Sequence, residues 1–248
     1  IFSSKKSKKA IHQISFRNIL VIIQFTVSIA LMLSSIIVNK QLGLIRKHDL
    51  GFDKEQVLVI RNDLGNRDQR FNILKNELEN NPDVKTLSSA SHVPAAGLTN
   101  WGGPAVAGDE NNISKQCGLL SINSQYFKAI GSEIIIGSDF DQTNISYKNK
   151  MIINESLQKE LGWKGPLGTK LIKLRDKKER EIIGVVKDIE FSTIHSKSQP
   201  VVFFYRDNGF DTFSRYIVIK LKSTDLTKTV ADIKNEWNRI SPEYPIDY

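Results

Sequence analysis

The sequence predicts an α+β protein in which one N-terminal membrane-spanning helix is followed by a two-lobed folded domain. Three observations predict this class. Residues 19–38 form an uncharged apolar run, strand and helix patterns occur near both ends of the remaining chain, and short strands and turns fill the region between them. The middle region therefore fits a lobe inserted into a layer that both ends of the body build.

Residues 19–38 are predicted to span a membrane. The run ILVIIQFTVSIALMLSSIIV contains no formal charge, and as a helix it would be about 30 Å long, the thickness of a bilayer's hydrocarbon core. A buried core helix would not usually follow five cations, and a cleaved signal peptide has a shorter apolar core and a small-residue cleavage site. We expect a basic leader at 1–18 and a stalk at 39–52.

The positive charge lies mainly beside this span. Residues 1–50 hold eight Lys and Arg residues and one acid, whereas residues 51–248 hold 27 basic and 26 acidic residues. A nucleic-acid-binding surface would put excess charge on the folded part, so nucleic acid is not an expected partner. Five cations precede the span and three follow it, which favours a cytoplasmic leader and an extracytoplasmic body.

The span carries candidate residues for packing against another membrane helix. Thr26, Ala30 and Ser34 recur every four residues and form a small-residue face of the kind that lets two helices approach closely. Gln24 adds an amide that needs a partner in lipid. A lipid-facing anchor with tolerated small residues is the alternative, and the packed helix is the interpretation that we favour.

The first part of the body alternates between strand and helix patterns. The run at 56–60 (QVLVI) predicts a strand, residues 67–80 predict a helix that ends before Pro82, and residues 84–91 predict a second strand. Strand, helix and strand within so short a stretch indicate an α/β unit.

The end of the body repeats this texture. Residues 216–221 (YIVIKL) predict a strand, and apolar residues at four-three spacing predict a helix over 226–240. Within a body at 53–248, the two ends (about 53–95 and 212–248) are expected to form one α/β layer.

The region at about 105–206 is predicted to be the inserted β-rich lobe. Asn123 and Asn154 are each expected to cap a short helix. Residues 169–186 predict a hairpin whose charged turn, which includes Arg180, lies in solvent. The Gly- and Pro-rich stretch before this lobe predicts a long loop, in which we expect Trp101 to fill the core.

The sequence contains no catalytic, cofactor or metal motif. The loop at 93–108 lacks a phosphate-binding glycine pattern, and no nucleophile elbow occurs. Cys117, the only cysteine, has no histidine nearby in sequence and can form no intrachain disulfide. The four histidines lack metal-ligand spacing and are His12, His48, His92 and His195. We therefore expect a protein that is not an enzyme, with no cofactor and no metal.

Several segments together resemble one family. They are QFTVSIAL with the following LGF, YFKAIGSEIIIGSDF (126–140), INESLQKELGW, and above all GVVKDIEFSTIHSKSQP (184–200). In order and spacing they are similar to the extracytoplasmic region of MacB/FtsX-type ABC transporter permeases. The resemblance covers nearly the whole chain.

This resemblance implies a fold and a set of partners. It implies a porter-like lobe built from both ends of the body, with a β-rich inserted lobe. The chain would be part of a longer permease in a bacterial inner membrane, with residues 39–248 in the periplasm. It further implies an ABC-type ATPase on a separate polypeptide, a second permease copy, contact with membrane lipid, and a periplasmic or outer-membrane partner.

Two functions follow as hypotheses. The first is a permease component that couples cytoplasmic ATP hydrolysis to motion of the periplasmic domain, for efflux or for mechanotransmission. The alternative is the ligand-sensing ectodomain of a single-span receptor. Lys187, Asp188 and His195 lie in the most distinctive segment, either as an inter-lobe polar cluster or as residues that shape a turn after a strand.

Overall fold

The structure is a computed structural model. It describes residues 16–47, 51–53, 55–62, 67–94, 96–106, 109–113, 116–140, 147, 149–173, 178–191, 198–205 and 215–246. The chain divides into two compact units, Ile1–His48 and Asp49–Tyr248, and each is described by itself. The second unit is called the body below.

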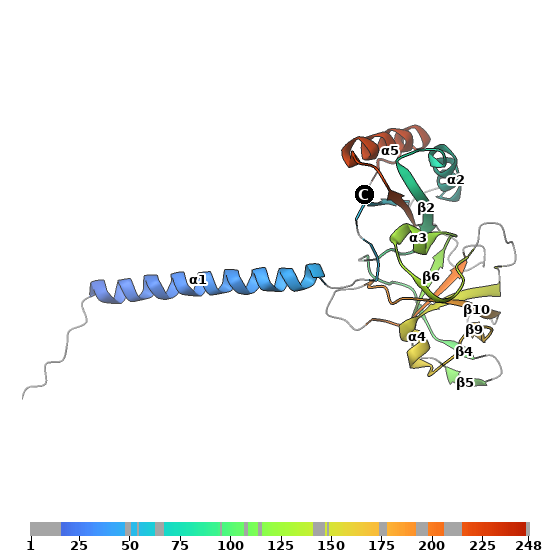
Figure 1. Ribbon diagram of the computed structural model, residues 1–248, viewed down its shortest axis with the longest axis horizontal. Coiled ribbons are helices and arrows are strands. Elements are labelled where there is room, and N and C mark those ends of the chain that lie inside the picture. The colour runs from blue at the N-terminus through green and yellow to red at the C-terminus, as the bar shows by residue number, and fades with distance from the viewer. Residues whose placement is uncertain are drawn as a thin grey trace, which may run out of the picture. The chain divides into compact units, whose positions relative to one another are not determined.

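The first unit contains one long helix, α1 (Phe16–Lys47), drawn in blue in Figure 1. Its segment Phe16–Gly43 is long and apolar enough to cross a membrane by length and composition. The helix continues through the predicted stalk as far as Lys47, because residues 39–47 contain no glycine pair or proline to stop it.

Both ends of the body form one α/β layer. The strands are β1 (Val57–Arg61), β2 (Val84–Ala90) and β12 (Tyr216–Leu221), and the helices are α2 (Arg67–Leu78) and α5 (Leu226–Ile240). β12 lies between β1 and β2 and pairs antiparallel with both, so the predicted strand-helix-strand unit is split by a strand from the far end of the chain.

Strand alternation gives this layer two buried faces. Ile217 and Ile219 of β12 pack with the apolar residues of α2 and α5, including the fully buried Trp237. Val218 faces the opposite side, in the cluster that contains helix α3 (Tyr126–Ile130). Full burial of each such side chain contributes about 1.5–3 kcal/mol, so β12 is held from both faces.

The middle of the chain forms the rest of the sheet. Its longer strands are β6 (Cys117–Ile122), β8 (Lys150–Asn154), β10 (Glu179–Val186) and β11 (Val201–Tyr205). The shorter strands are β3 (Trp101–Gly102), β4 (Pro104–Val106), β5 (Asp109–Ile113), β7 (Ile134–Gly137) and β9 (Lys170–Lys173), and the helix is α4 (Glu155–Glu160). The order across the sheet is β1-β12-β2-β6-β11-β8-β10-β9-β4-β5, and the α/β layer joins the middle strands where Ala90 pairs with Ile122.

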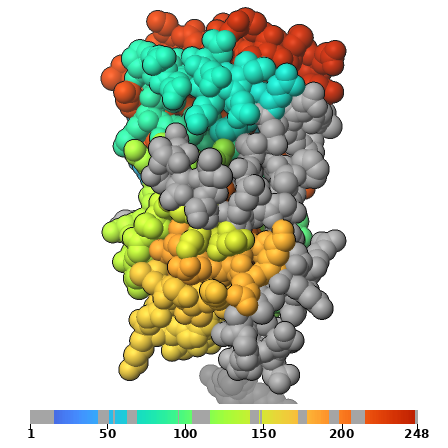
Figure 2. All heavy atoms as spheres, turned by 90° about the vertical axis from the view of Figure 1, so that its right-hand side faces the viewer, coloured from blue at the N-terminus to red at the C-terminus, as the bar shows by residue number. Residues whose placement is uncertain are grey.

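In the space-filling view, the side chains of α2 and α5 gather at one end of the body, in cyan and red, and residues of about 150–170 lie towards the other end, in yellow (Figure 2). The mixed α+β class predicted from sequence is the class observed. The proposed limits of the two lobes, about 53–95 with 212–248 and about 105–206, stay a prediction.

Some local expectations are confirmed and others are wrong. Asn154 caps α4 by accepting from the Leu157 amide at 3.1 Å. Asn123 caps no helix, because α3 begins after Gln125. Gln125 has a left-handed backbone conformation (φ 63°), and its side chain makes no capping hydrogen bond. The predicted loop contains the short strands β3 and β4, and Trp101 is 40% exposed instead of filling the core.

The predicted hairpin of β9 and β10 forms, with Arg180 opposite Leu171. Arg180 does not belong to a solvated tip, since it is 1% exposed and lies 5.2 Å from the Phe204 ring.

Candidate functional site

The described residues provide no obvious site for covalent or metal chemistry. No group of three or more His, Cys, Asp or Glu residues among them is placed to hold a metal ion. Cys117 is fully buried, and this burial raises the pKa of its thiol to about 12, so it stays protonated. His92 is buried between the hydroxyls of Ser91 (3.0 Å) and Thr99 (2.7 Å).

Several close contacts of the body involve residues 51–53 and 55–56, which we call the entry segment. Gly51 has a φ of +73°, in the left-handed region that glycine adopts most easily. A Cβ at Gly51 would lie 1.7 Å from the carbonyl oxygen of Asp188, so no other residue fits this backbone approach. Phe52 then packs against the cluster that contains α3. The chain enters the body in close contact with the turn at Asp188.

Asp53 attaches the entry segment to α3 and to β12. Its amide donates to the Ile130 carbonyl at 2.8 Å, and its carboxylate oxygen Oδ2 lies 2.6 Å from the Lys220 ammonium. The Lys220 hydrogen bond, followed by the Glu55 amide, lowers the pKa of Asp53 below its ordinary value. A Cβ at Gly131 would approach the Asp53 Cβ to 2.6 Å, so the C-terminal glycine of α3 allows this contact.

Lys220 is the central residue of this attachment, which we call the Lys220 lock. It points to the α3 side of β12, because its neighbours Ile219 and Leu221 point to the α2 and α5 side. Its ammonium donates to the Glu55 carbonyl at 2.7 Å as well as to Asp53, and its side chain is 10% exposed. A buried ammonium is stable only when it is paired and hydrogen-bonded, and the entry segment provides both.

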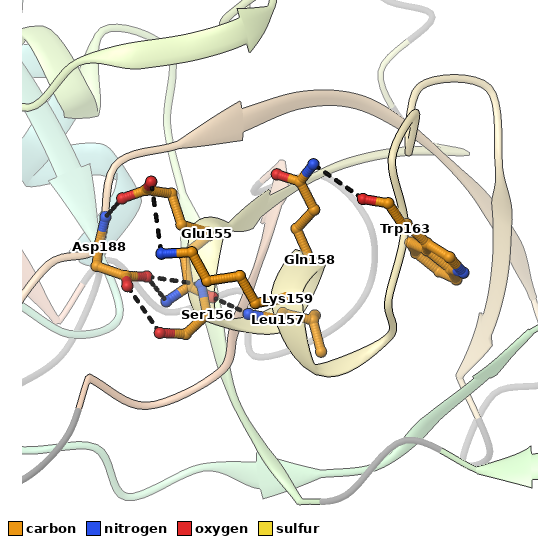
Figure 3. Close-up of polar contacts among 8 residues, drawn as sticks. Glu155, Ser156, Leu157, Gln158, Lys159, Trp163 and Asp188 are labelled. Atoms are coloured by element: carbon orange, nitrogen blue, oxygen red, sulfur yellow. Dashed lines mark hydrogen bonds and ion pairs between the residues drawn. The ribbon is translucent and has the colours of Figure 1, made fainter.

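Asp188 organises a second network beside the first (Figure 3). Its Oδ1 accepts from the Ser156 amide at 2.8 Å and from the Asn154 side-chain amide at 2.7 Å, and its Oδ2 accepts from the Ser156 hydroxyl at 2.7 Å. The backbone amide of Asp188 donates to Glu155 at 3.2 Å. The carboxylate therefore satisfies donors at the start of α4, where negative charge is also favourable.

Asn154 extends this network to β11. It is 1% exposed, and its carbonyl oxygen accepts from the Val201 amide at 2.8 Å in addition to capping α4. Its amide nitrogen also donates to the Gln199 carbonyl at 2.8 Å. The end of β8, the start of β11 and the turn after β10 are thus joined by two side chains.

The predicted site residues lie in different places. Asp188 lies in the network at α4, and the backbone amide of Lys187 donates to the Glu133 carbonyl at 2.9 Å. His195 lies outside the described residues. An inter-lobe cluster of these three residues, or a purely turn-shaping role for them, stays a prediction.

On α1, the Thr26 and Ser34 hydroxyls donate to the carbonyls of Ile22 and Ala30, each at 2.8 Å. Gln24, Thr26, Ala30 and Ser34 stay candidates for helix packing.

A further set of contacts holds the end of the body. The Trp237 indole donates to the Tyr244 carbonyl at 2.7 Å, and the Arg70 guanidinium lies 5.2 Å from the Tyr244 ring and 5.9 Å from the Trp237 ring. A cavity of about 420 Å³ lies beside Arg70, between α2 and residues 240–244. The apolar spacing of 226–240 predicts the helix that carries Trp237, but no sequence pattern predicts the contact of Trp237 with Tyr244.

The family comparison agrees with this architecture. A family model for the MacB-like periplasmic core domain matches residues 20–236. The chain belongs to this family. It is therefore the MacB-like periplasmic domain of an ABC-transporter-type permease, preceded by an apolar helix that suits a membrane anchor.

Solved structures share the fold of this MacB-like domain. One is the periplasmic region of MacB from Actinobacillus actinomycetemcomitans, with 17% identity, a TM-score of 0.58, and coverage of 79% of this chain and 89% of that one. Another is the extracellular domain of the noncanonic ABC-type transporter YknZ from Gram-positive bacteria, with 14% identity, a TM-score of 0.53, and coverage of 77% and 100%. No curated protein sequence matches the chain. At these identities the structural likeness establishes the fold alone.

Proposed function

We propose that this chain is part of the permease subunit of a MacB/FtsX-type ABC transporter in a bacterial inner membrane, with residues 39–248 in the periplasm. A separate ATPase binds and hydrolyses ATP in the cytoplasm, and the permease works as a pair of copies. The MacB-like domain carries no catalysis of its own. Its task is to receive motion from the membrane helices and to pass it to a periplasmic or outer-membrane partner or to a transported substrate.

The observation that carries this proposal is the Lys220 lock on the entry segment. A displacement of the chain before Gly51 acts first on residues 51–56. Their contacts with Lys220 and Ile130 lead into β12 and α3, and the contact of Gly51 with Asp188 leads to α4 and the middle strands. The Lys220–Asp53 bond is short and charge-assisted, and such hydrogen bonds are stronger than neutral ones, so the entry segment is held firmly to β12.

Recovery of the partner ATPase tests the proposal directly. The full-length gene product is expressed in its own membrane with native flanking sequence, solubilised gently and analysed by mass spectrometry for co-purifying proteins. We expect an ABC-type ATPase in stoichiometric amount. A folded, monodisperse sample that repeatedly lacks any ATPase would refute the permease and favour a ligand-sensing ectodomain on a single-span receptor.

The coupling step needs a separate experiment on the purified complex. Amide hydrogen exchange is measured over β12 and α3 with and without ATP. We expect ATP to change the exchange in the wild type, and Lys220→Met to reduce that change while ATP hydrolysis persists. Lys222→Met is the matched control, because Lys222 lies two residues further on and is exposed. An equal response of both variants would refute coupling through the Lys220 lock.

A further inference from the structure

The start of strand β2 lies beside a cavity of about 200 Å³. β2 lies between helix α2, on one face of the α/β layer, and helix α3, on the other (Figure 1). One edge of β2 pairs with β12, whereas among the described residues the ladder to β6 on the other edge contains only the pair of Ala90 with Ile122. The first residues of β2 therefore keep an open edge. The cavity is lined by residues of α2 and β2 and by the residue before α3, and these are Lys75, Leu78, Glu79, Val84, Lys85, Thr86, Leu87 and Gln125.

Two lysines give the cavity its positive charge. Lys75 belongs to α2 and Lys85 to β2, so the two charges come from different walls. Neither ammonium forms an ion pair with any residue that the structure describes. Glu79 is the only carboxylate among the lining residues, so the formal charge of two lysines and one glutamate is +1. A ligand that enters this cavity meets an excess of positive charge.

Gln125 lines the cavity from the α3 side. Its backbone has a φ of 63°, in the left-handed region that glycine adopts without strain and other residues rarely adopt. Strained backbone positions of this kind cluster at functional sites. The Thr86 hydroxyl donates to the Gln125 amide oxygen at 2.7 Å and orients the amide. The amide nitrogen forms no hydrogen bond with any described residue, so its two N–H donors are available to a ligand.

The size and chemistry of the cavity select a small oxyanion. Pockets for drug-sized ligands measure about 300–1,000 Å³, so this cavity holds a smaller group. Lysine ammonium groups bind phosphate oxygens as compact point charges, and two of them match a doubly charged group. The apolar side chains of Leu78, Val84 and Leu87 reduce screening by water and strengthen these charge interactions.

We propose that this cavity binds one phosphate group, held by Lys75, Lys85 and the Gln125 amide. The group is either the free ion or the phosphate of a small ester, since both present the same oxygens. This site goes beyond the proposed function and is independent of the ATPase partner.

Equilibrium dialysis of the full-length, detergent-solubilised chain against radiolabelled inorganic phosphate tests the site. Chloride keeps the ionic strength constant, so general screening does not change during the titration. We expect saturable binding of one phosphate per chain. Lys75→Met and Lys85→Met should each weaken binding about tenfold, because each removes a charge-assisted hydrogen bond. Binding that does not saturate would overturn the proposal.

Two charge variants separate this site from general attraction to a basic protein. Lys128→Met is the matched control, because Lys128 is exposed on α3 and does not line the cavity, and binding should change by less than about twofold. Glu79→Gln removes the negative charge of the cavity and should strengthen binding by about threefold. Equal weakening by all three lysine variants would overturn the site.

Gln125→Gly separates the role of the amide from folding. Glycine relieves the left-handed strain, so the urea midpoint should stay close to the wild-type value while phosphate binding weakens by about threefold or more. Binding that is unaffected by Gln125→Gly would overturn the amide contact.

Competition identifies the class and the source of the anion. Acetate that displaces phosphate at equal concentration would overturn the phosphate assignment in favour of a carboxylate. Glycerol 3-phosphate should compete, and either order of affinity supports the site: tighter binding than inorganic phosphate identifies an ester as the ligand, and weaker binding identifies the free ion.

Discussion

Substitution of Asp53 should lower the free energy of unfolding more than substitution of Lys220, its partner in the Lys220 lock. Asp53→Asn leaves the Lys220 ammonium, whose side chain is 10% exposed, without its counter-charge. Loss of one member of a buried pair costs about 3–5 kcal/mol, and the 48% exposure of Asp53 reduces our expectation to about 2 kcal/mol. Lys220→Met removes the buried charge itself and leaves a carboxylate that water can hydrate, so we expect a loss of about 1 kcal/mol.

Urea unfolding of the detergent-solubilised chain, followed by tryptophan fluorescence, measures both values. All three tryptophans lie in the body, at positions 101, 163 and 237, so the signal reports the body and not α1. The double variant should be no less stable than Asp53→Asn alone, because it contains no unpaired buried ammonium. Lys220→Met costing more than Asp53→Asn, or both variants unfolding at the wild-type midpoint, would refute the assignment of Lys220 as the buried member of the pair.

Substitutions at Gly51, Asp188 and Asp139 provide three further tests. Gly51→Ala should lower the free energy of unfolding by more than about 2 kcal/mol in the same assay, because left-handed backbone strain adds to a clash with the Asp188 carbonyl. Gly162→Ala is the control: Gly162 also has a positive φ but open space around it, so the loss should be about 1 kcal/mol. Equal losses for the two variants would contradict the clash. Asp188→Asn should lower the free energy of unfolding by about 1 kcal/mol, and Asp188→Ala should lower it more, because Asn keeps one acceptor for the Ser156 amide. If the ATP-driven change in hydrogen exchange survives Asp188→Asn, a turn-shaping role for Asp188 is favoured. If that change is lost, an inter-lobe role is favoured. Burial raises the pKa of the Asp139 carboxyl to about 6, so the folded state keeps this proton to a higher pH than the unfolded state does. The free energy of unfolding should therefore fall as the pH rises from about 4 to about 6. Asp139→Asn should reduce this fall, and a pH profile that the substitution leaves unchanged would refute the prediction.

Local patterns were sufficient to predict the α/β layer. The apolar runs at 56–60 and 216–221 and the apolar stripe of 226–240 predict two strands and a helix, and all three elements form there. The order β1-β12-β2 could not be read in the same way. Pairing of β12 between β1 and β2 depends on contacts across more than 120 residues of sequence, and no local propensity specifies them.

The site was harder to predict because its key residues are separated in the chain. Asp53 and Lys220 are 167 residues apart, and Lys220 stands in an otherwise apolar strand, YIVIKL. A lysine inside a doubly buried strand was the available signal, because such a lysine needs a partner. For Arg180 the sequence pattern gave a wrong expectation. The charges around it suggested a solvated turn, whereas the arginine is buried against Phe204.

Asp188 contacts two separate parts of the body, one through its side chain and one through its backbone carbonyl. Its carboxylate satisfies donors of Asn154 and Ser156, and these bonds hold the start of α4 in place. Its carbonyl oxygen meanwhile lies against Gly51 of the entry segment. Because the side chain is fixed by α4, the carbonyl is fixed as well, and the entry segment meets a rigid surface. Under the proposed function, the residues that shape this turn would also determine where membrane motion reaches the middle strands.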